Sequence, residues 1–173
     1  MKNRETKMIL AIDVYYAEST AKVVGVLFEE HEEIPKEIIT EQVSEIMEYV
    51  PGEFYKRELP CILKILEKVN LKNIEFIIVD GHVYVDNDKK LGLGGHLWES
   101  LNKEVPIIGV AKKHFHNTEE VSFPVFRGES KNPLYVSSVG IDSKSAIDFV
   151  QNMEGKFRFP SILKILDQHT RID

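Results

Sequence analysis

The chain has 173 residues, of which 43% are apolar and 29% are charged, and these proportions are typical of a globular protein rather than of a disordered chain. The formal net charge of -6 excludes a general electrostatic attraction to nucleic acid, so a site for a polyanion requires a local positive patch. Cys61 is the only cysteine, which excludes an intrachain disulfide and favours a reducing compartment.

No apolar run reaches the length of a membrane span. The apolar stretch that follows the polar, basic residues 1–7 stops at Asp13, which is too short for a secretion signal. We therefore expect a cytoplasmic protein that is a monomer and has no membrane partner.

The first half of the chain predicts an antiparallel meander followed by a helix. Residues 8–16 and 21–28 are apolar strands joined by a short polar connection, which is typical of a hairpin. A third strand is predicted over residues 40–46, and Pro51-Gly52 ends this part. The next helix is expected to carry Pro60 in its first turn, followed by an apolar stripe at helical spacing.

The second half alternates strands and helices. Apolar strands are predicted over residues 74–79, 106–110 and 134–139, with a looser region over residues 112–133. The expected helices cover residues 96–102 after a glycine-rich turn, residues 143–152 after an Asp142 or Ser143 cap, and the residues from Phe159-Pro160 to about His169. This order predicts one α/β domain over residues 1–173, with a mixed sheet whose first three strands are antiparallel and later strands parallel, flanked by helices.

Two of these apolar strands carry an aspartate at the end, Asp13 and Asp80. A carboxylate beside a buried strand is costly unless it is paired, and two that meet on neighbouring strands suit a hard cation such as Mg²⁺. Glu58 and Asp167 are further candidate ligands. For Glu58 a helix N-terminal acid is an equally good interpretation, and for Asp167 a solvent-facing helix residue is the simpler one.

Lys112 is the candidate phosphate-binding residue, because it emerges where an apolar strand ends, at the edge where open sheets bind ligands. His82 follows Asp80-Gly81 and is expected at the rim of the same site, whereas His114 and His116 are expected in a surface loop. The sequence has no nucleophilic triad, P-loop, zinc-type cysteine spacing or dinucleotide-binding fingerprint.

Together these segments resemble the endonuclease V family of inosine-directed nucleases, which have a ribonuclease H-like fold. The resemblance runs in the family's order from about Leu10 to Asp167, and the chain resembles an N-terminally short member. Its motifs are Ile12-Asp13-Val14-Tyr15-Tyr16, Tyr49-Val50-Pro51-Gly52, Arg57-Glu58, Asp80-Gly81-His82, Gly92-Leu93-Gly94-Gly95-His96-Leu97, Gly109-Val110-Ala111-Lys112, Tyr135-Val136-Ser137 and Arg158-Phe159-Pro160.

The resemblance implies an endonuclease that depends on Mg²⁺, with Mn²⁺ as a substitute, and cleaves DNA or RNA near inosine. It implies that Asp13, Asp80 and Glu58 are catalytic metal ligands, that Asp167 lies at the metal site, and that Lys112 is the catalytic lysine near the scissile phosphate.

The same resemblance assigns residues to the substrate. Tyr49 and Pro51 match the wedge that separates the strands, and Gly52 and Gly81 match backbone positions near an extruded base, beside which His82 is expected. A flipped base needs a close-fitting pocket that glycines allow.

A second hypothesis is a nucleic-acid-binding protein of the same fold whose catalysis is altered or lost. The acidic segment Asp86-Asn87-Asp88 and the net charge of -6 motivate it, because acids are unfavourable beside a phosphate backbone. A purely structural or protein-interaction domain is a third hypothesis, which leaves Asp13, Asp80 and Lys112 without a role.

Overall fold

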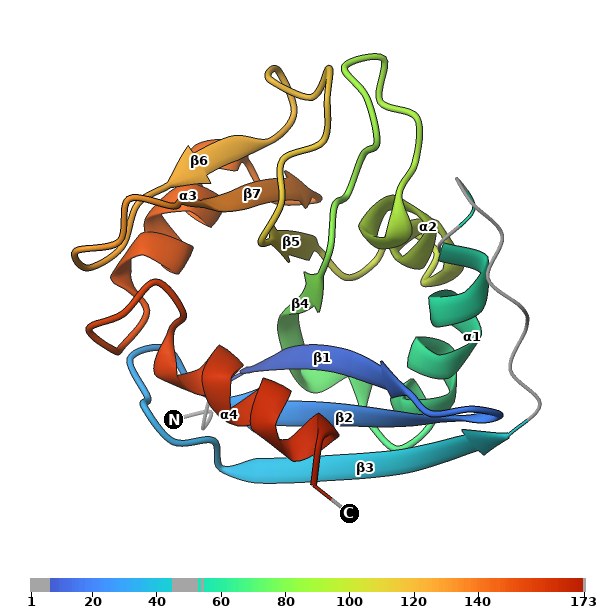
Figure 1. The fold of residues 1–173 in the computed structure, drawn as a ribbon. Coiled ribbons are helices and arrows are strands. Elements are labelled where there is room, and N and C mark those ends of the chain that lie inside the picture. Colours follow the sequence, from blue (N-terminus) through green and yellow to red (C-terminus); the bar gives the residue numbers. More distant parts are fainter. Residues whose placement is uncertain (1–6, 45–52, 54, 173) are drawn as a thin grey trace, which may run out of the picture.

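The computed structural model describes residues 7–44, 53 and 55–172, and these form a seven-stranded sheet with helices on both faces (Figure 1). The elements are β1 (Met8–Tyr16), β2 (Thr20–Phe28), β3 (Glu37–Ser44), α1 (Tyr55–Leu66), the 3-10 turn η1 (Leu71–Asn73), β4 (Ile74–Asp80), α2 (Leu93–Ser100), β5 (Ile107–Ala111), β6 (Phe123–Val125), β7 (Leu134–Val139), α3 (Ser143–Asn152) and α4 (Ser161–Thr170). The predicted order of elements is confirmed, and β6 is the short strand within the looser region.

The strands lie in the order β3-β2-β1-β4-β5-β7-β6. The first three strands pair antiparallel, and β4 and β5 continue the sheet parallel to β1. The expectation of parallel later strands fails at β7, which runs antiparallel to β5 and pairs antiparallel with β6. The carboxyl ends of β1, β4 and β5 therefore lie at one edge of the sheet.

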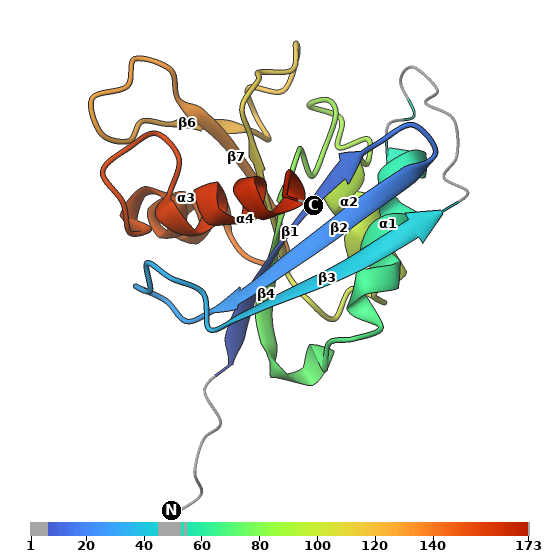
Figure 2. The ribbon, with the colours of Figure 1, turned by 60° about the horizontal axis from the view of Figure 1, so that its bottom comes forward.

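Two hydrophobic clusters fill the space on the two faces of the sheet. One packs α3 and α4 against residues such as Ala11, Ile78 and Val110, and the other packs α1 and α2 against residues such as Ile12 and Val79. Figure 2 shows the two helix pairs on opposite sides of the strands. Because side chains alternate along a strand, β1, β4 and β5 each contribute to both clusters, which explains their nearly continuous apolar sequences.

The structure corrects the start of α2, because Gly94 and Gly95 lie inside this helix rather than in a turn before it. A Cβ atom on Gly95 would lie 2.7 Å from the carbonyl oxygen of Val83, and one on Gly94 would lie 2.9 Å from the Val83 side chain. These glycines therefore serve the close approach of the helix to the chain after β4, and not a change of chain direction.

Two other boundaries differ from those predicted. Helix α1 begins at Tyr55, so Pro60 lies within the helix; Lys56 and Pro60 are both exposed, so water can solvate the carbonyl group that the missing N–H leaves free. Strand β3 covers Glu37–Ser44, and the last two residues of the predicted 40–46 strand lie outside the described residues. The Asp142 cap of α3 is confirmed, because its carboxylate accepts a bond from the Ser145 N–H at 3.0 Å.

None of the described helices is long and apolar enough to cross a membrane.

Gly109 in β5 is the position where an added methyl group should be most costly to the site. A Cβ atom there would lie 2.5 Å from the carbonyl oxygen of Gly81 and 2.8 Å from the Ser137 hydroxyl. We predict that Gly109→Ala lowers the free energy of unfolding by about 1–3 kcal/mol, the usual cost of overpacking, in a chemical denaturation experiment.

Gly25→Ala is the matched control, because a Cβ atom there would meet only side-chain atoms, of Ile39 and Leu10, at 3.1 Å. The control should cost less, since side chains can shift more readily than backbone. Equal costs for the two variants would contradict the close approach of β5 to the chain after β4.

Candidate metal and phosphate site

Asp13, Asp80 and Lys112 lie on one face of the sheet at one edge. In β1 and β4 the parallel register pairs Ile12 with Val79, so Asp13 and Asp80 are the next residues on adjacent strands. Asp13 is two residues after Ala11, and Asp80 is two residues after Ile78. Ala11 and Ile78 belong to the cluster beneath α3 and α4, so both aspartates are on that face of the sheet. The sequence prediction that these two side chains come together is therefore confirmed by the register of two neighbouring strands.

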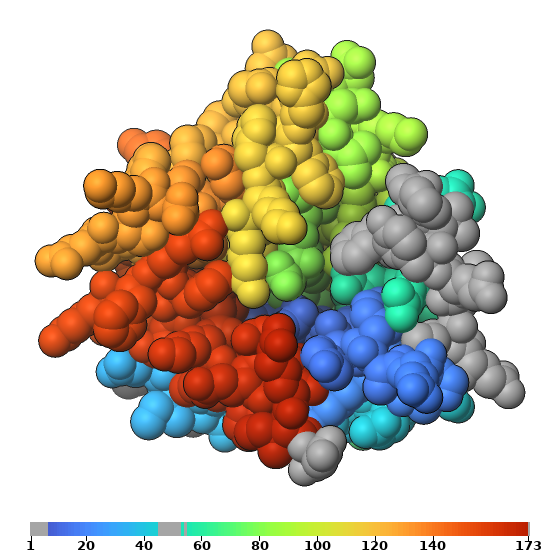
Figure 3. All heavy atoms as spheres, in the orientation of Figure 1, coloured from blue at the N-terminus to red at the C-terminus, as the bar shows by residue number. Residues whose placement is uncertain are grey.

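A cleft opens above these residues, between the sheet edge and α4. Its polar and charged lining is Asp13, Asp80, Lys112, Lys164 and Asp167, and its apolar lining is Ile12, Ile78, Val79, Val110, Phe159, Leu163 and Leu166. In Figure 3 the blue residues of β1, the green residues near the end of β4, the yellow segment after β5 and the red α4 converge at the centre of one face. The structure thus gathers three of the predicted acids and the predicted lysine at one opening.

Glu58 approaches the same aspartates from the other side. A smaller pocket beside the cleft is lined by Glu58, Asp13 and Asp80, together with Ile12, Val14, Ile62 and Leu93. Glu58 is buried in the first turn of α1, where the neighbouring Arg57 guanidinium lies 3.7 Å from the centre of the Tyr16 ring at the end of β1. This cation–π contact fixes the start of α1 against β1 and so holds Glu58 near Asp13.

The acids raise one another's pKa values. Burial, and then the charge of Asp80, raises the pKa of Asp13 from its ordinary value of 3.8 to about 7. Burial, and then the charges of Asp80 and Asp13, raises the pKa of Glu58 from 4.5 to about 8. The pKa of Asp80 is also raised, mainly by burial of its carboxyl group within the cleft, although the residue as a whole is exposed at the strand end, and Lys112 opposes that rise.

These residues fit a divalent cation by their chemistry. Oxygen Oε2 of Glu58 is buried and has no hydrogen-bond partner among the described residues, and the acids around it are crowded enough to repel one another. A divalent cation would remove both costs.

Within the described residues, however, no three His, Cys, Asp or Glu side chains are arranged so that they could hold a metal ion as they stand. Mg²⁺ is commonly bound by one or two carboxylates, with water and substrate phosphate completing its shell, so the adjacent pair Asp13 and Asp80 meets the minimum.

The predicted substrate residues are placed differently. Gly81 has a φ of +149°, a conformation that favours glycine, and a Cβ atom there would contact only Leu93 at 3.7 Å. His82 is buried and lines neither the cleft nor the smaller pocket, so the expectation that it lies at the rim of the carboxylate site is wrong. Tyr49, Pro51 and Gly52 lie outside the described residues.

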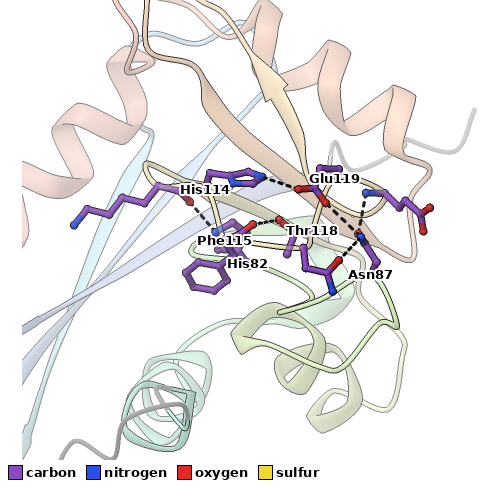
Figure 4. Close-up of polar contacts among 9 residues, drawn as sticks. His82, Asn87, His114, Phe115, Thr118 and Glu119 are labelled. Atoms are coloured by element: carbon purple, nitrogen blue, oxygen red, sulfur yellow. Dashed lines mark hydrogen bonds and ion pairs between the residues drawn. The ribbon is translucent and has the colours of Figure 1, made fainter.

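His82 instead joins two loops that rise above the sheet edge (Figure 4). Its ring stacks on Phe115 with 4.0 Å between ring centres, and its Nε2 lies 3.0 Å from the carbonyl oxygen of Lys113. Because Lys113 is next to Lys112, this contact links the chain after β4 to the chain after β5. His114 and His116 lie in the exposed part of this second loop, as expected.

Asp86 and Asn87 of the acidic segment 86–88 form hydrogen bonds within the protein. The Asn87 carboxamide oxygen accepts a bond from the Glu120 N–H at 2.9 Å, and its amide donates to the side chains of Asn117 at 3.2 Å and Glu119 at 3.4 Å (Figure 4). Asp86 accepts a bond from the Lys90 N–H at 3.1 Å. Asp86 and Asn87 therefore stabilise the two loops.

The sequence interpretation gave no site role to three residues around the site. Phe159 was assigned to the start of the last helix and to the motif Arg158-Phe159-Pro160, yet its ring also lines the cleft. The buried Ser137 hydroxyl accepts a bond from the Val83 N–H at 3.0 Å and so fixes the chain after Asp80. Lys164 also lines the cleft. The sequence could have indicated Lys164, because it lies three residues before Asp167 on one helix and residues three apart share a helix face.

Comparison with known proteins decides the family. A model of the endonuclease V family matches residues 1–168. The chain belongs to the endonuclease V family. Endonuclease V of Trichormus variabilis is 32% identical over 139 residues, which cover 69% of this chain and 61% of that protein's length. Endonuclease V of Pyrococcus horikoshii is 29% identical over 171 residues, which cover 96% of this chain and 74% of the relative.

Solved structures of endonuclease V share the fold. The catalytic domain of human endonuclease V superposes with a TM-score of 0.78 at 22% identity, covering 96% of this chain and 81% of that one. Ciona intestinalis endonuclease V, solved in complex with a 24mer DNA containing an inosine followed by a ribo-adenosine, gives a TM-score of 0.79 at 18% identity, covering 95% of this chain and 84% of that one. The predicted ribonuclease H-like mixed sheet is therefore confirmed.

The raised pKa values predict how stability depends on pH when metal is removed by chelation. The unfolded chain loses the Asp13 proton near pH 3.8 and the Glu58 proton near pH 4.5, whereas the folded protein holds them up to about pH 7 and about pH 8, so raising the pH through these windows favours unfolding. We predict that Asp13→Asn raises the unfolding temperature by several degrees at pH 8 and raises it clearly less at pH 5. Mg²⁺ should stabilise the parent more at pH 8 than at pH 6, because it binds the ionised acids.

Asp148→Asn is the control, since Asp148 is exposed on α3 and lines neither pocket. Its unfolding temperature should follow that of the parent at both pH values. If Asp13→Asn instead lowered the unfolding temperature at pH 8 in the presence of chelator, that result would contradict the mutual repulsion of these acids.

Proposed function

We propose that this chain is a metal-dependent endonuclease that hydrolyses phosphodiester bonds of DNA or RNA near inosine. The observation that carries the proposal is the adjacent pair Asp13 and Asp80 at the ends of two parallel strands, with Lys112 in the same cleft. Membership of the endonuclease V family and the fold shared with the inosine-DNA complex of the Ciona protein support it. The chain spans 61% of the length of the Trichormus variabilis relative.

Asp13 and Asp80 are the residues that would hold the metal, with Glu58 on one side of the pair and Asp167 on the other. A bound Mg²⁺, or Mn²⁺ in its place, supplies Lewis-acid polarisation of a phosphate and a more acidic water. Lys112 contributes a positive charge to the lining of the same cleft, where it would stabilise negative charge on the scissile phosphate.

The substrate side of the proposal involves Gly81 and the residues around it. The unusual backbone of Gly81 and the open space beside it suit the close approach of an extruded base. His82 contributes by fixing the loop after β5 through its contact with the Lys113 carbonyl oxygen. Tyr49 and Pro51 are proposed as the wedge, and Gly52 as a backbone position near the extruded base, from the family motif that they match. We further propose a monomer that acts in the cytoplasm, which is consistent with the single, buried Cys61.

Cleavage of oligonucleotides tests the proposal. We predict that the protein with Mg²⁺ cuts inosine-containing DNA or RNA and leaves the matched adenosine oligonucleotide intact. Asp13→Asn and Asp80→Asn should each lower the cleavage rate by more than about 100-fold while leaving substrate binding intact, because they remove a metal ligand and a negative charge. Lys112→Met should lower the rate by about 10²–10³-fold.

Asp148→Asn again serves as the control and should cleave as the parent does. Tight binding of inosine oligonucleotides without cleavage by folded, Mg²⁺-loaded protein would favour the altered nucleic-acid-binding protein. Neither binding nor cleavage of any nucleic acid would reject both functions.

A further inference from the structure

Lys112 lies just beyond the part of β5 that the sheet holds in place. The last pair of the β5–β7 ladder joins Ala111 to Tyr135, so the backbone of Lys112 has no partner in the sheet. The side chain is exposed, and a lysine side chain of four carbons samples many rotamers unless other groups restrict it. A lysine that must meet one phosphate oxygen therefore needs support from outside the strand.

The segment between α3 and α4 supplies two contacts to this lysine. The Lys112 Nζ lies 4.8 Å from the centre of the Phe159 ring, which also lines the cleft. The neighbouring Arg158 donates from Nη2 to the carbonyl oxygen of Lys112 at 2.8 Å and to that of Pro133 at 2.8 Å. One segment therefore restrains both the backbone and the ammonium group of Lys112.

The ring restrains the ammonium group without neutralising it. Asp13, Asp80 and Asp167 line the same cleft, yet the ion pairs within the described part of the chain do not include Lys112. A carboxylate partner would occupy the charge that a phosphate needs, whereas the face of an aromatic ring attracts a cation and leaves its N–H groups free to donate.

We propose that Phe159 and Arg158 are positioning residues that hold Lys112 toward the scissile phosphate. This inference rests on the proposed nuclease function. Phe159 acts on the ammonium group through its ring, and Arg158 acts on the backbone by bridging the carbonyl groups of Lys112 and Pro133. Neither residue needs to contact the substrate.

Steady-state kinetics on an inosine oligonucleotide test the role. Phe159→Leu keeps an apolar side chain that can pack on the cluster beneath α4, but it removes the ring. We expect kcat to fall about five- to tenfold, the size of one cation–π contact, with KM changed less than about twofold. Phe159→Tyr, which keeps the ring, should restore kcat to within about twofold of the parent.

Phe126→Leu is the matched control, because Phe126 is an exposed phenylalanine that does not line the cleft. It should leave kcat and KM unchanged. A Phe159→Leu protein with the kcat of a cleaving parent, or with only a raised KM, would overturn the inference.

A second readout does not require cleavage. Lysines methylated with ¹³C-formaldehyde give separate NMR signals, and Lys112→Arg identifies the signal of Lys112 by its loss. The ring current of Phe159 should shift this signal away from those of exposed lysines, and Phe159→Leu should return it to them. An unshifted Lys112 signal in the parent would overturn the contact, whereas a shifted signal in a protein that cleaves no nucleic acid would reject the nuclease function and leave the contact established.

Discussion

The site depends on the repulsion among carboxylates that two parallel strands bring together. The pairing of Ile12 with Val79 makes Asp13 and Asp80 neighbours, and helices α1 and α4 then add Glu58 and Asp167 from the two faces of the sheet. Burial and proximity raise the pKa values of Asp13 and Glu58 to about 7 and about 8. Such a cluster destabilises the metal-free protein through burial and repulsion of its carboxylates. A divalent cation is the simplest partner that removes this repulsion, and its binding would then stabilise the fold.

The rest of the molecule fixes the chain that surrounds this cluster. The Ser137 hydroxyl and the backbone of Gly109 hold the segment after β4, while His82 and Asn87 tie that segment to the loop after β5. Arg158 and Phe159 then connect the start of α4 to Lys112. Residues from four distant parts of the chain thus restrain the two strand ends that carry Asp80 and Lys112.

Much of this arrangement was predictable from the sequence, because the apolar runs of β1 and β4 each end in an aspartate and because parallel strands present the same edge. The antiparallel placement of β7 and the position of Gly94 and Gly95 inside α2 were not, since both depend on tertiary packing. The burial of His82 was missed for a similar reason: its stacking partner Phe115 lies far along the chain, on a loop that no local pattern places.

The location of a bound divalent cation tests the central claim most directly. In crystals soaked with Mn²⁺, anomalous scattering should place a metal ion within coordination distance of the carboxylates of both Asp13 and Asp80, and the peak should be lost in Asp80→Asn. Side chains of Asp13 and Asp80 that diverge, or a fully ordered cleft with no metal peak in Mn²⁺, would contradict the account.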